Sequence, residues 1–294
     1  MEIDRMELKR QARERMALTD PKFWVVALAY LAMTTGVSWI ISFIPLPEVR
    51  TVQIFFQILL AMYTTVVHFG LCLWALWTYR QLDPDANSLM QGFSVAGRVI
   101  LMELGIYIRV LGWYFLVAFV LAIPVFTLML SGAGAGAGML TLLIFFAGLI
   151  ATIIVLQLRY ALAPYLLADR PDDGPSAPIR RSSDLMRGWK WELFKLEFSF
   201  IGWEIINFIL SAGVALFFLG RAGLLAADVV LDDALINQAI SVIYSTPVVI
   251  LSTLVTIPVS LWLIPYRETA RAGFYDARIL SVPDERDMPE MPPL

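Results

Sequence analysis

The chain has 294 residues, of which 59% are hydrophobic and 16% are charged. Soluble domains are about half apolar and about a quarter charged, so this composition excludes an ordinary water-soluble fold and predicts an integral membrane protein. The net charge of −3 gives no basic excess for nucleic-acid binding, and the single cysteine, Cys72, excludes an internal disulfide.

The amino terminus predicts a charged helix followed by a retained membrane span. Residues 1–22 read as a cytoplasmic amphipathic helix. The apolar run that follows lacks a small-residue cleavage site, which is typical of a start-transfer helix that stays in the protein. We expect a transmembrane domain over residues 23–280 and a disordered, Pro-rich and acidic tail over 281–294.

Six apolar runs predict six transmembrane helices, because about 20 helical residues cross a bilayer core of about 30 Å. We expect these spans at 23–44, 54–78, 100–129, 139–167, 193–219 and 245–266. Between them, residues 84–95 and 221–243 mix charged and apolar side chains, which favours interfacial amphipathic helices. Residues 131–138 (SGAGAGAG) read as an uncharged turn. The predicted fold class is all-α, a polytopic bundle of six membrane helices.

The positive charges predict the orientation of this bundle. Of the 22 Lys and Arg residues, only Arg50 and Arg221 fall on one side and Arg109 lies inside a span, which leaves 19 on the other side. Lys and Arg in short loops are retained in the cytoplasm during insertion. We therefore expect both termini in the cytoplasm, in an N-in/C-in arrangement.

A weak internal repeat accompanies the spans. SLMQGF (88–93) precedes the third span, DLMRGW (184–189) precedes the fifth, and each even-numbered span ends near a tyrosine. Because every copy enters from the same side, the repeats would be parallel. The pattern predicts three units, each a helical hairpin, at about 1–82, 83–170 and 171–280.

One region resembles a known family. The segment RYALAPYLLADRPDDG, the run SSDLMRGWKWELFKLEFSFIGW and the later LWLIPYRETARAGFY are similar to the domain-of-unknown-function 975 family of bacterial integral membrane proteins. The likeness covers about 85–276 and is most specific from Ser183 to Trp203. The resemblance implies a six-helix protein of the bacterial inner membrane and no known activity. Glu204 departs from it, since we expect an apolar residue there.

Ionisable groups inside a membrane span need a partner or a function. On the fifth span, Glu197, Glu204, Asn207 and Ser211 fall on one helix face and should point into the bundle. The stripe predicts either a site for a cation or polar substrate, or a structural carboxylate. In the third span, Arg109 and Glu103 lie six residues apart and on different faces. We expect Arg109 to pair with Glu204 or to hold a lipid phosphate, and Glu103 to be interfacial.

His68 is the only histidine, and Thr64, His68 and Cys72 share one face of the second span. One His and one Cys are too few ligands for a metal, and no HxxxH, CxxC or HExxH motif occurs. The sequence therefore predicts no metal site and no cofactor. His68 is either a proton relay or a neutral imidazole hydrogen-bonded between helices.

Cations near the predicted inner surface indicate binding to anionic lipid headgroups, and they fit topology determination equally well. Arg159 lies near the inner end of the fourth span and can snorkel toward lipid phosphate. The other candidates surround two tryptophans in the loop 169–190: Arg180, Arg181, Arg187 and Lys190.

Three functions follow from these patterns. The first is non-catalytic binding or transport of a lipid, peptide or small ion, in a pocket lined by Glu204, Arg109, Asn207, His68 and Glu103. The second is an accessory or scaffold protein that contacts other membrane proteins through its Arg/Trp-rich surface. The third, a lipid-modifying enzyme, has no motif such as GxSxG in its favour, so we expect no catalytic activity. The expected partners are membrane lipids and other membrane proteins.

Overall fold

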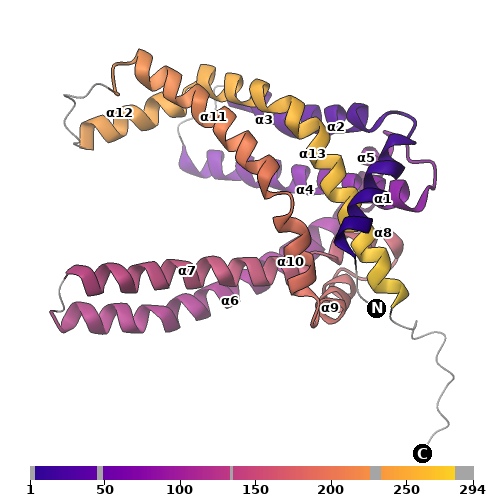
Figure 1. Cartoon of the computed structure of the whole chain (residues 1–294), viewed down its shortest axis with the longest axis horizontal. Helices are drawn as coiled ribbons and strands as arrows, with labels where there is room; N and C mark the ends of the chain where they lie inside the picture. The colour runs from indigo at the N-terminus through magenta and orange to yellow at the C-terminus, as the bar shows by residue number, and fades with distance from the viewer. Residues whose placement is uncertain (1–3, 45–48, 133–134, 226–232, 282–294) are drawn as a thin grey trace, which may run out of the picture.

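The computed structural model describes residues 4–44, 49–132, 135–225 and 233–281. This part of the chain is all-α, as predicted, and six of its helices are long and apolar enough to cross a membrane. The spans form three hairpins that meet at one end of the molecule, near α1 (Arg5–Ala17) and α8 (Ala163–Asp169) (Figure 1). We call this the basal end.

The first hairpin comprises α2 (Phe23–Leu31), α3 (Val37–Ser42) and α4 (Arg50–Arg80), with a π-helical turn at Ala32–Gly36 between α2 and α3. At the basal end, α1 packs on α4 and α13. The face of α1 that it buries carries three apolar residues spaced four apart: Leu8, Ala12 and Met16.

The second hairpin pairs α6 (Ala96–Leu130) with α7 (Ala135–Tyr160), and α5 (Ser88–Gln91) precedes it. Because α7 already begins at Ala135, the turn expected over 131–138 is shorter than predicted. The fourth span agrees with the expected range, since Gly136–Asp169 is long and apolar enough to cross a membrane, although a turn after Tyr160 separates α7 from α8.

The third hairpin follows α9 (Ser176–Leu185), which lies in the predicted inner loop. The expected single span at 193–219 is wrong, because a turn at residues 199–200 separates two helices. The last span continues well past residue 266 into the basal end. These elements are α10 (Lys190–Phe198), α11 (Ile201–Arg221), α12 (Asp233–Ile243) and α13 (Thr246–Leu280).

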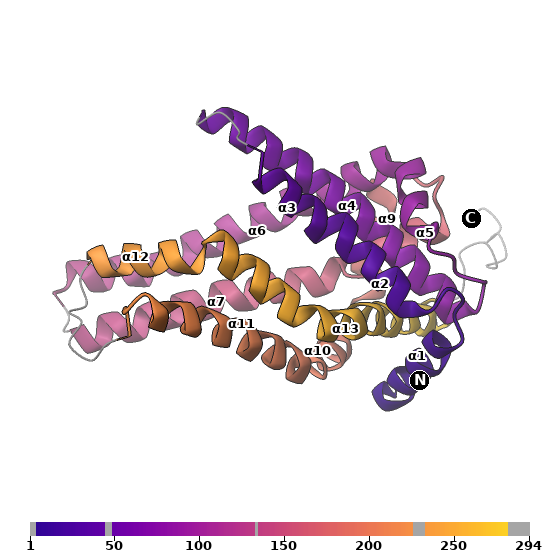
Figure 2. The same ribbon diagram turned by 90° about the horizontal axis from the view of Figure 1, so that it is seen from above.

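The buried core sits at the basal end and not between the spans. Large aromatic side chains fill it, among them Trp74, Tyr165, Phe200 and Tyr275, each at most 1% exposed. By contrast, the most apolar windows of α6 and α11 bury none of their residues. The hairpins accordingly diverge away from the basal end, since Figure 1 separates the second hairpin from the other two and Figure 2 separates the first.

Two glycines allow α5 to lie directly against α4. A Cβ atom built on Gly70 would stand 2.5 Å from the carbonyl oxygen of Leu89, and one on Gly92 would stand 2.6 Å from that of Val66. Only glycine permits two backbones to approach so closely. The contact fixes the start of the second hairpin on the first.

Nothing in the fold tests the division into three repeats, which stays a prediction. A helix, α12, lies within 221–243, where an interfacial helix is expected; its position at a membrane surface stays a prediction, and residues 226–232 lie outside the described part. The predicted disordered tail also lies outside it, apart from Ser281.

Candidate functional site

The uncharged stretches of three described spans have their basal limits at the same level. Three stretches contain no Asp, Glu, Lys, Arg or His: 110–130 in α6, 135–158 in α7 and 246–266 in α13. A helix of about 20 residues extends about 30 Å, the thickness of a bilayer hydrocarbon core. The charged residues that end these stretches, Arg109, Arg159 and Arg267, therefore lie at the basal boundary of the apolar zone.

Glu268 is the centre of a buried polar network at this level. Its Oε2 atom accepts a 2.7 Å hydrogen bond from the hydroxyl of Tyr165, and its Oε1 accepts one of 2.8 Å from Nη1 of Arg271. From α4, the thiol of Cys72 donates to Oε2 over 3.9 Å, and Nε2 of His68 lies 3.9 Å from Oε1. Glu268 therefore joins α4, α8 and α13.

The network continues as a chain of alternating charges. Glu197 of α10 accepts hydrogen bonds from Nε of Arg271 and, at 2.7 Å, from Nε of Arg267. Arg267 also donates to Glu204 at 3.2 Å. Three carboxylates thus face two guanidinium groups, which leaves one negative charge in excess.

A second network locks the basal ends of α4, α8 and α13 together. Arg80 donates to Asp169 at 2.5 and 2.9 Å and to Asp276 at 2.9 and 2.6 Å. The hydroxyl of Tyr275 donates to Asp169 at 2.6 Å, and its ring stacks on Tyr165 with centroids 5.6 Å apart. Charge-assisted contacts of this density are well suited to holding the three hairpins at fixed positions.

The expected pairing of Arg109 with Glu204 is wrong. Glu204 pairs with Arg267, whereas Nη1 of Arg109 donates to the carbonyl of Gly105 in its own helix at 2.8 Å. The pairing failed because the break before α11 moves Glu204 into the first turn of that helix. Glu204 therefore lies at the boundary, with its side chain 49% exposed, and not deep in the span.

The other predicted pocket residues, Glu103, His68 and Asn207, stand on three different helices. Glu103 of α6 lies within electrostatic range of His68, and so does Tyr30 of α2. Asn207 stands on α11, and its buried Oδ1 accepts no hydrogen bond within the described residues. His68 is thus the member of this set that joins the Glu268 network.

The predicted headgroup cations separate into two groups. Arg159 is half-buried, and its Nε donates to Ser183 of α9 at 2.7 Å. The others lie on the basal surface and in part have acidic neighbours. Arg181 lies 3.6 Å from Asp173, Arg187 lies 3.4 Å from Asp184, Arg180 is exposed and Lys190 is half-buried.

A groove of about 350 Å³ runs along the α6–α7 hairpin and ends at Arg159. Apart from that guanidinium, its walls are apolar or weakly polar. The lining residues are Trp113, Ala151, Thr152, Val155, Leu156 and Arg159.

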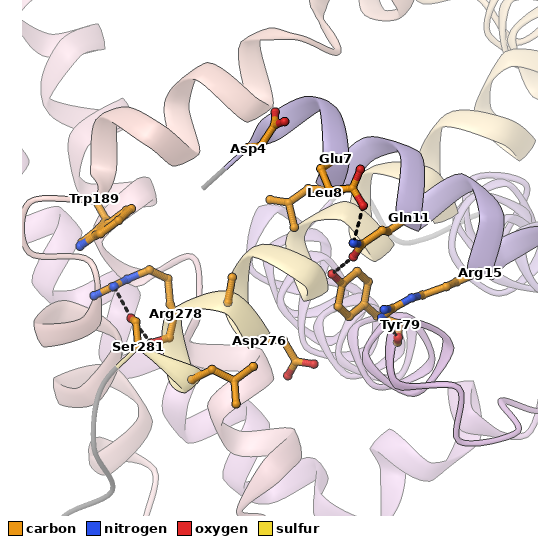
Figure 3. Close-up of a pocket in the computed structure, with 12 residues that line it drawn as sticks. Asp4, Glu7, Leu8, Gln11, Arg15, Tyr79, Trp189, Asp276, Arg278 and Ser281 are labelled. Carbon is orange, nitrogen blue, oxygen red and sulfur yellow. Dashed lines mark hydrogen bonds between the residues drawn. The ribbon is translucent and has the colours of Figure 1, made fainter. Parts of the chain in front are cut away.

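A larger pocket of about 500 Å³ opens at the basal surface between α1 and the end of α13 (Figure 3). Its polar groups are already bound to one another. Glu7 accepts hydrogen bonds from Arg10 and then Gln11, which hold the pKa of that exposed carboxyl at about 2. Arg278 donates to the carbonyl of Leu185 and stacks on Trp189. The pocket therefore offers few free partners to a ligand.

Comparison with known proteins supplies a family for this architecture. The model of the family described as "Protein of unknown function (DUF975)" matches residues 1–281. The chain belongs to the DUF975 family. The match includes α1 and the first hairpin, which the predicted likeness over 85–276 did not reach. Comparison with curated proteins and with solved structures gave no match.

Several central residues of this DUF975 protein were not singled out from the sequence. Glu268 and Arg271 fall beyond the predicted end of the last span at residue 266 and received no role, and Tyr165 was expected only to mark the membrane interface. A signal existed in RETAR (267–271), where two arginines and a glutamate fall within one helical turn. Three charges on one turn next to an apolar span indicate a partner on another helix, because none can be left unpaired in hydrocarbon.

Proposed function

We propose that this multi-pass membrane protein of the DUF975 family binds an anionic phospholipid without catalysing a reaction. Arg109 and Arg159 hold the phosphate of the headgroup, and the groove on α6 and α7 receives an acyl chain. We also propose that the basal end faces the cytoplasm of a bacterial cell, because it carries 18 of the 21 Lys and Arg residues that the structure describes.

The observation that carries the proposal is Arg159 at the end of an apolar groove. The bond to Ser183 uses Nε and so fixes the guanidinium. Within the described residues no carboxylate pairs with Arg159, and its two terminal nitrogens make no hydrogen bond. A fixed guanidinium with free donors is well suited to a phosphate group.

Arg109 supplies a second cation on the same side of the hairpin. It lies four residues before Trp113, which lines the groove, and residues four apart share a helix face. The side chain of Arg109 lies over Gly105, one turn toward the basal end. A Cβ atom built on Gly105 would stand 3.0 Å from Nη1 of Arg109, so the missing side chain of Gly105 leaves room for the guanidinium. Because the uncharged stretches of both helices begin next to these arginines, both guanidiniums lie at the depth of lipid headgroups.

The test measures bound lipid. The purified protein is reconstituted in nanodiscs of equal parts phosphatidylglycerol and phosphatidylcholine, released, and analysed by native mass spectrometry. We expect phosphatidylglycerol to be enriched on the wild-type protein. The double variant Arg109→Gln, Arg159→Gln should lose this enrichment. Arg187→Gln, which removes an exposed basal charge beside Asp184, should keep it.

Two outcomes would contradict the proposal. Equal enrichment in the double variant and in Arg187→Gln would mean that the groove does not select the headgroup. Displacement of the lipid by millimolar inorganic phosphate would mean that the arginines bind free phosphate, with no contribution from the acyl chain.

One observation favours a second function, an accessory role in contact with other membrane proteins. Trp191 and Phe198 on α10 are 63% and 56% exposed, and Phe194 stacks between them with centroids 5.1 and 5.8 Å away. Exposed aromatic rows are enriched in protein interfaces, and they also anchor helices at membrane surfaces. Crosslinking from Trp191 replaced by a photoreactive residue tests this function, which predicts one protein adduct instead of lipid adducts.

A further inference from the structure

We propose that His68, Cys72 and Glu268 form a binding site for one Zn²⁺ ion. The three side chains offer a nitrogen, a sulfur and an oxygen whose ligand atoms all lie within 4.8 Å of one another. The sequence argued against a metal because one His and one Cys were too few. That reason no longer holds, since the fold brings a third ligand, Glu268, next to them, although Glu268 lies 196 positions after Cys72 in the chain.

Two of the three separations between ligand atoms are close to those that a tetrahedral ion requires, and the third is at most 4.8 Å. Sγ of Cys72 lies 3.8 Å from Nδ1 of His68 and 3.9 Å from Oε2 of Glu268. A zinc ion about 2.3 Å from sulfur and about 2.0 Å from nitrogen or oxygen holds such pairs about 3.5 Å apart. Side-chain shifts of a few tenths of an ångström would therefore close these two edges around an ion.

The donor set selects the metal. A thiolate and an imidazole favour borderline or soft cations over Mg²⁺ and Ca²⁺, which prefer oxygen ligands. Zn²⁺ accepts sulfur, nitrogen and carboxylate oxygen together and needs no redox partner. Three protein ligands leave a fourth position for water.

Neighbouring groups orient the carboxylate as they do in metal sites. Tyr165 and Arg271 both donate to Glu268, and Arg271 is in turn neutralised by Glu197. Ligating carboxylates are commonly fixed by hydrogen bonds of this kind. The charges also balance. The network carries one excess negative charge, the thiol of Cys72 adds a second when its proton leaves for water, and Zn²⁺ neutralises both.

An ion can reach the site from the side of the imidazole. Cys72 is 1% exposed and the side chain of Glu268 is 8% exposed, whereas the side chain of His68 is 42% exposed. His68 therefore forms the accessible wall of a site whose other two ligands are buried.

The experiment measures zinc on the full-length protein in detergent, prepared without a histidine tag because the native chain has a single histidine. Protein loaded with ZnCl₂ is desalted, and its zinc content is measured by mass spectrometry. We expect one zinc ion per chain in the wild type. Cys72→Ser and His68→Gln should each weaken the affinity at least about 100-fold, since even the loss of an outer-shell partner weakens it 10–100-fold.

The matched control is Glu192→Gln, which removes a carboxylate paired with Lys195 outside the cluster and should keep the zinc. Because a ligand variant can also disturb folding, the wild-type protein is loaded with Co²⁺ as well. We expect a thiolate-to-cobalt charge-transfer absorption, and protection of Cys72 from a thiol reagent by Zn²⁺. A wild-type protein that retains no zinc, or a cobalt complex without the thiolate band, would overturn the proposal.

Discussion

The hydroxyl of Tyr165 donates a 2.7 Å hydrogen bond to the carboxylate of Glu268, although the two residues lie 103 positions apart. Tyr165 follows the second hairpin, and Glu268 lies in the last helix of the third. Both side chains are buried. This contact therefore couples two hairpins that diverge elsewhere, and it does so where the core is densest.

Removing that hydroxyl tests its contribution to stability. Tyr165→Phe leaves a buried carboxylate without one of its donors. Hydrogen bonds to charged groups contribute about 1.5–3 kcal/mol, so we expect a loss of about 2 kcal/mol in the free energy of unfolding in detergent. Tyr244→Phe is the control, because Tyr244 is 76% exposed and surface changes stay within about 0.5 kcal/mol. Equal effects of the two variants would contradict this reading.

Glu197 should matter more than Glu204. The side chain of Glu197 is 15% exposed and binds two arginines, whereas that of Glu204 is 49% exposed and binds one. Breaking a buried ion pair costs about 3–5 kcal/mol, and an exposed pair contributes at most about 1 kcal/mol. We expect Glu197→Gln to lower the unfolding free energy by about 3 kcal/mol and Glu204→Gln by less than 1 kcal/mol. A larger loss of unfolding free energy for Glu204→Gln than for Glu197→Gln would contradict this prediction, because the more stabilising carboxylate would then be the one on α11.

Arg109 and Glu204 should act independently, because they do not pair. Effects of residues without shared contacts add within about 0.5 kcal/mol. We expect Arg109→Ala and Glu204→Gln to be additive in a double-mutant cycle. The comparison cycle is Arg267→Ala with Glu197→Gln, whose 2.7 Å ion pair should give a coupling of about 0.5–3 kcal/mol. Coupling in the first cycle alone would restore the pairing expected from the sequence.

The sequence predicts the spans because their signal is local. Hydrophobic runs such as 100–129 exceed the length needed to cross a bilayer, and no alternative environment accepts them. It does not predict the partners of buried charges. Arg109 and Glu204 appear equally deep when residues are counted from the ends of the predicted spans. The turn at residues 199–200 makes α11 begin later than predicted, so Glu204 lies near the start of its helix and not deep within it.

The Glu268 network likewise depends on contacts between helices that the sequence does not predict. Its members come from α4, α8, α10, α11 and α13, and their pairing depends on how separate helices rotate and dock. Periodicity reports which residues share a face of one helix. It does not report which faces meet, so His68 and Cys72 could be paired from the sequence and Glu268 could not.

Gly70 should be intolerant of a side chain. A Cβ atom at this position would stand 2.5 Å from a carbonyl oxygen and 2.7 Å from Cα of Leu89. Backbone atoms cannot move aside as a flexible side chain can, so we expect Gly70→Ala to destabilise the protein by about 1–3 kcal/mol. Gly112→Ala in α6 meets nothing within 4 Å and should stabilise its helix by about 0.5–1 kcal/mol. Thermal unfolding of both variants measures the difference, and equal melting temperatures would contradict the close approach of α5 to α4.

The proposed orientation can be tested by labelling in intact cells. Cys72→Ser removes the native thiol, and a single new cysteine is then introduced. It is placed either at Ser131, which follows α6 at the end of the second hairpin away from the basal end, or at Asp184 in α9 near the basal end. In the proposed orientation, retention of Lys and Arg places the basal end in the cytoplasm, so a membrane-impermeant maleimide should label Ser131→Cys in whole cells. Asp184→Cys, beside Arg187, should react only after lysis. Labelling of Asp184→Cys in intact cells would place the arginine-rich end outside, where cytoplasmic retention of Lys and Arg could no longer explain why the charges gather there.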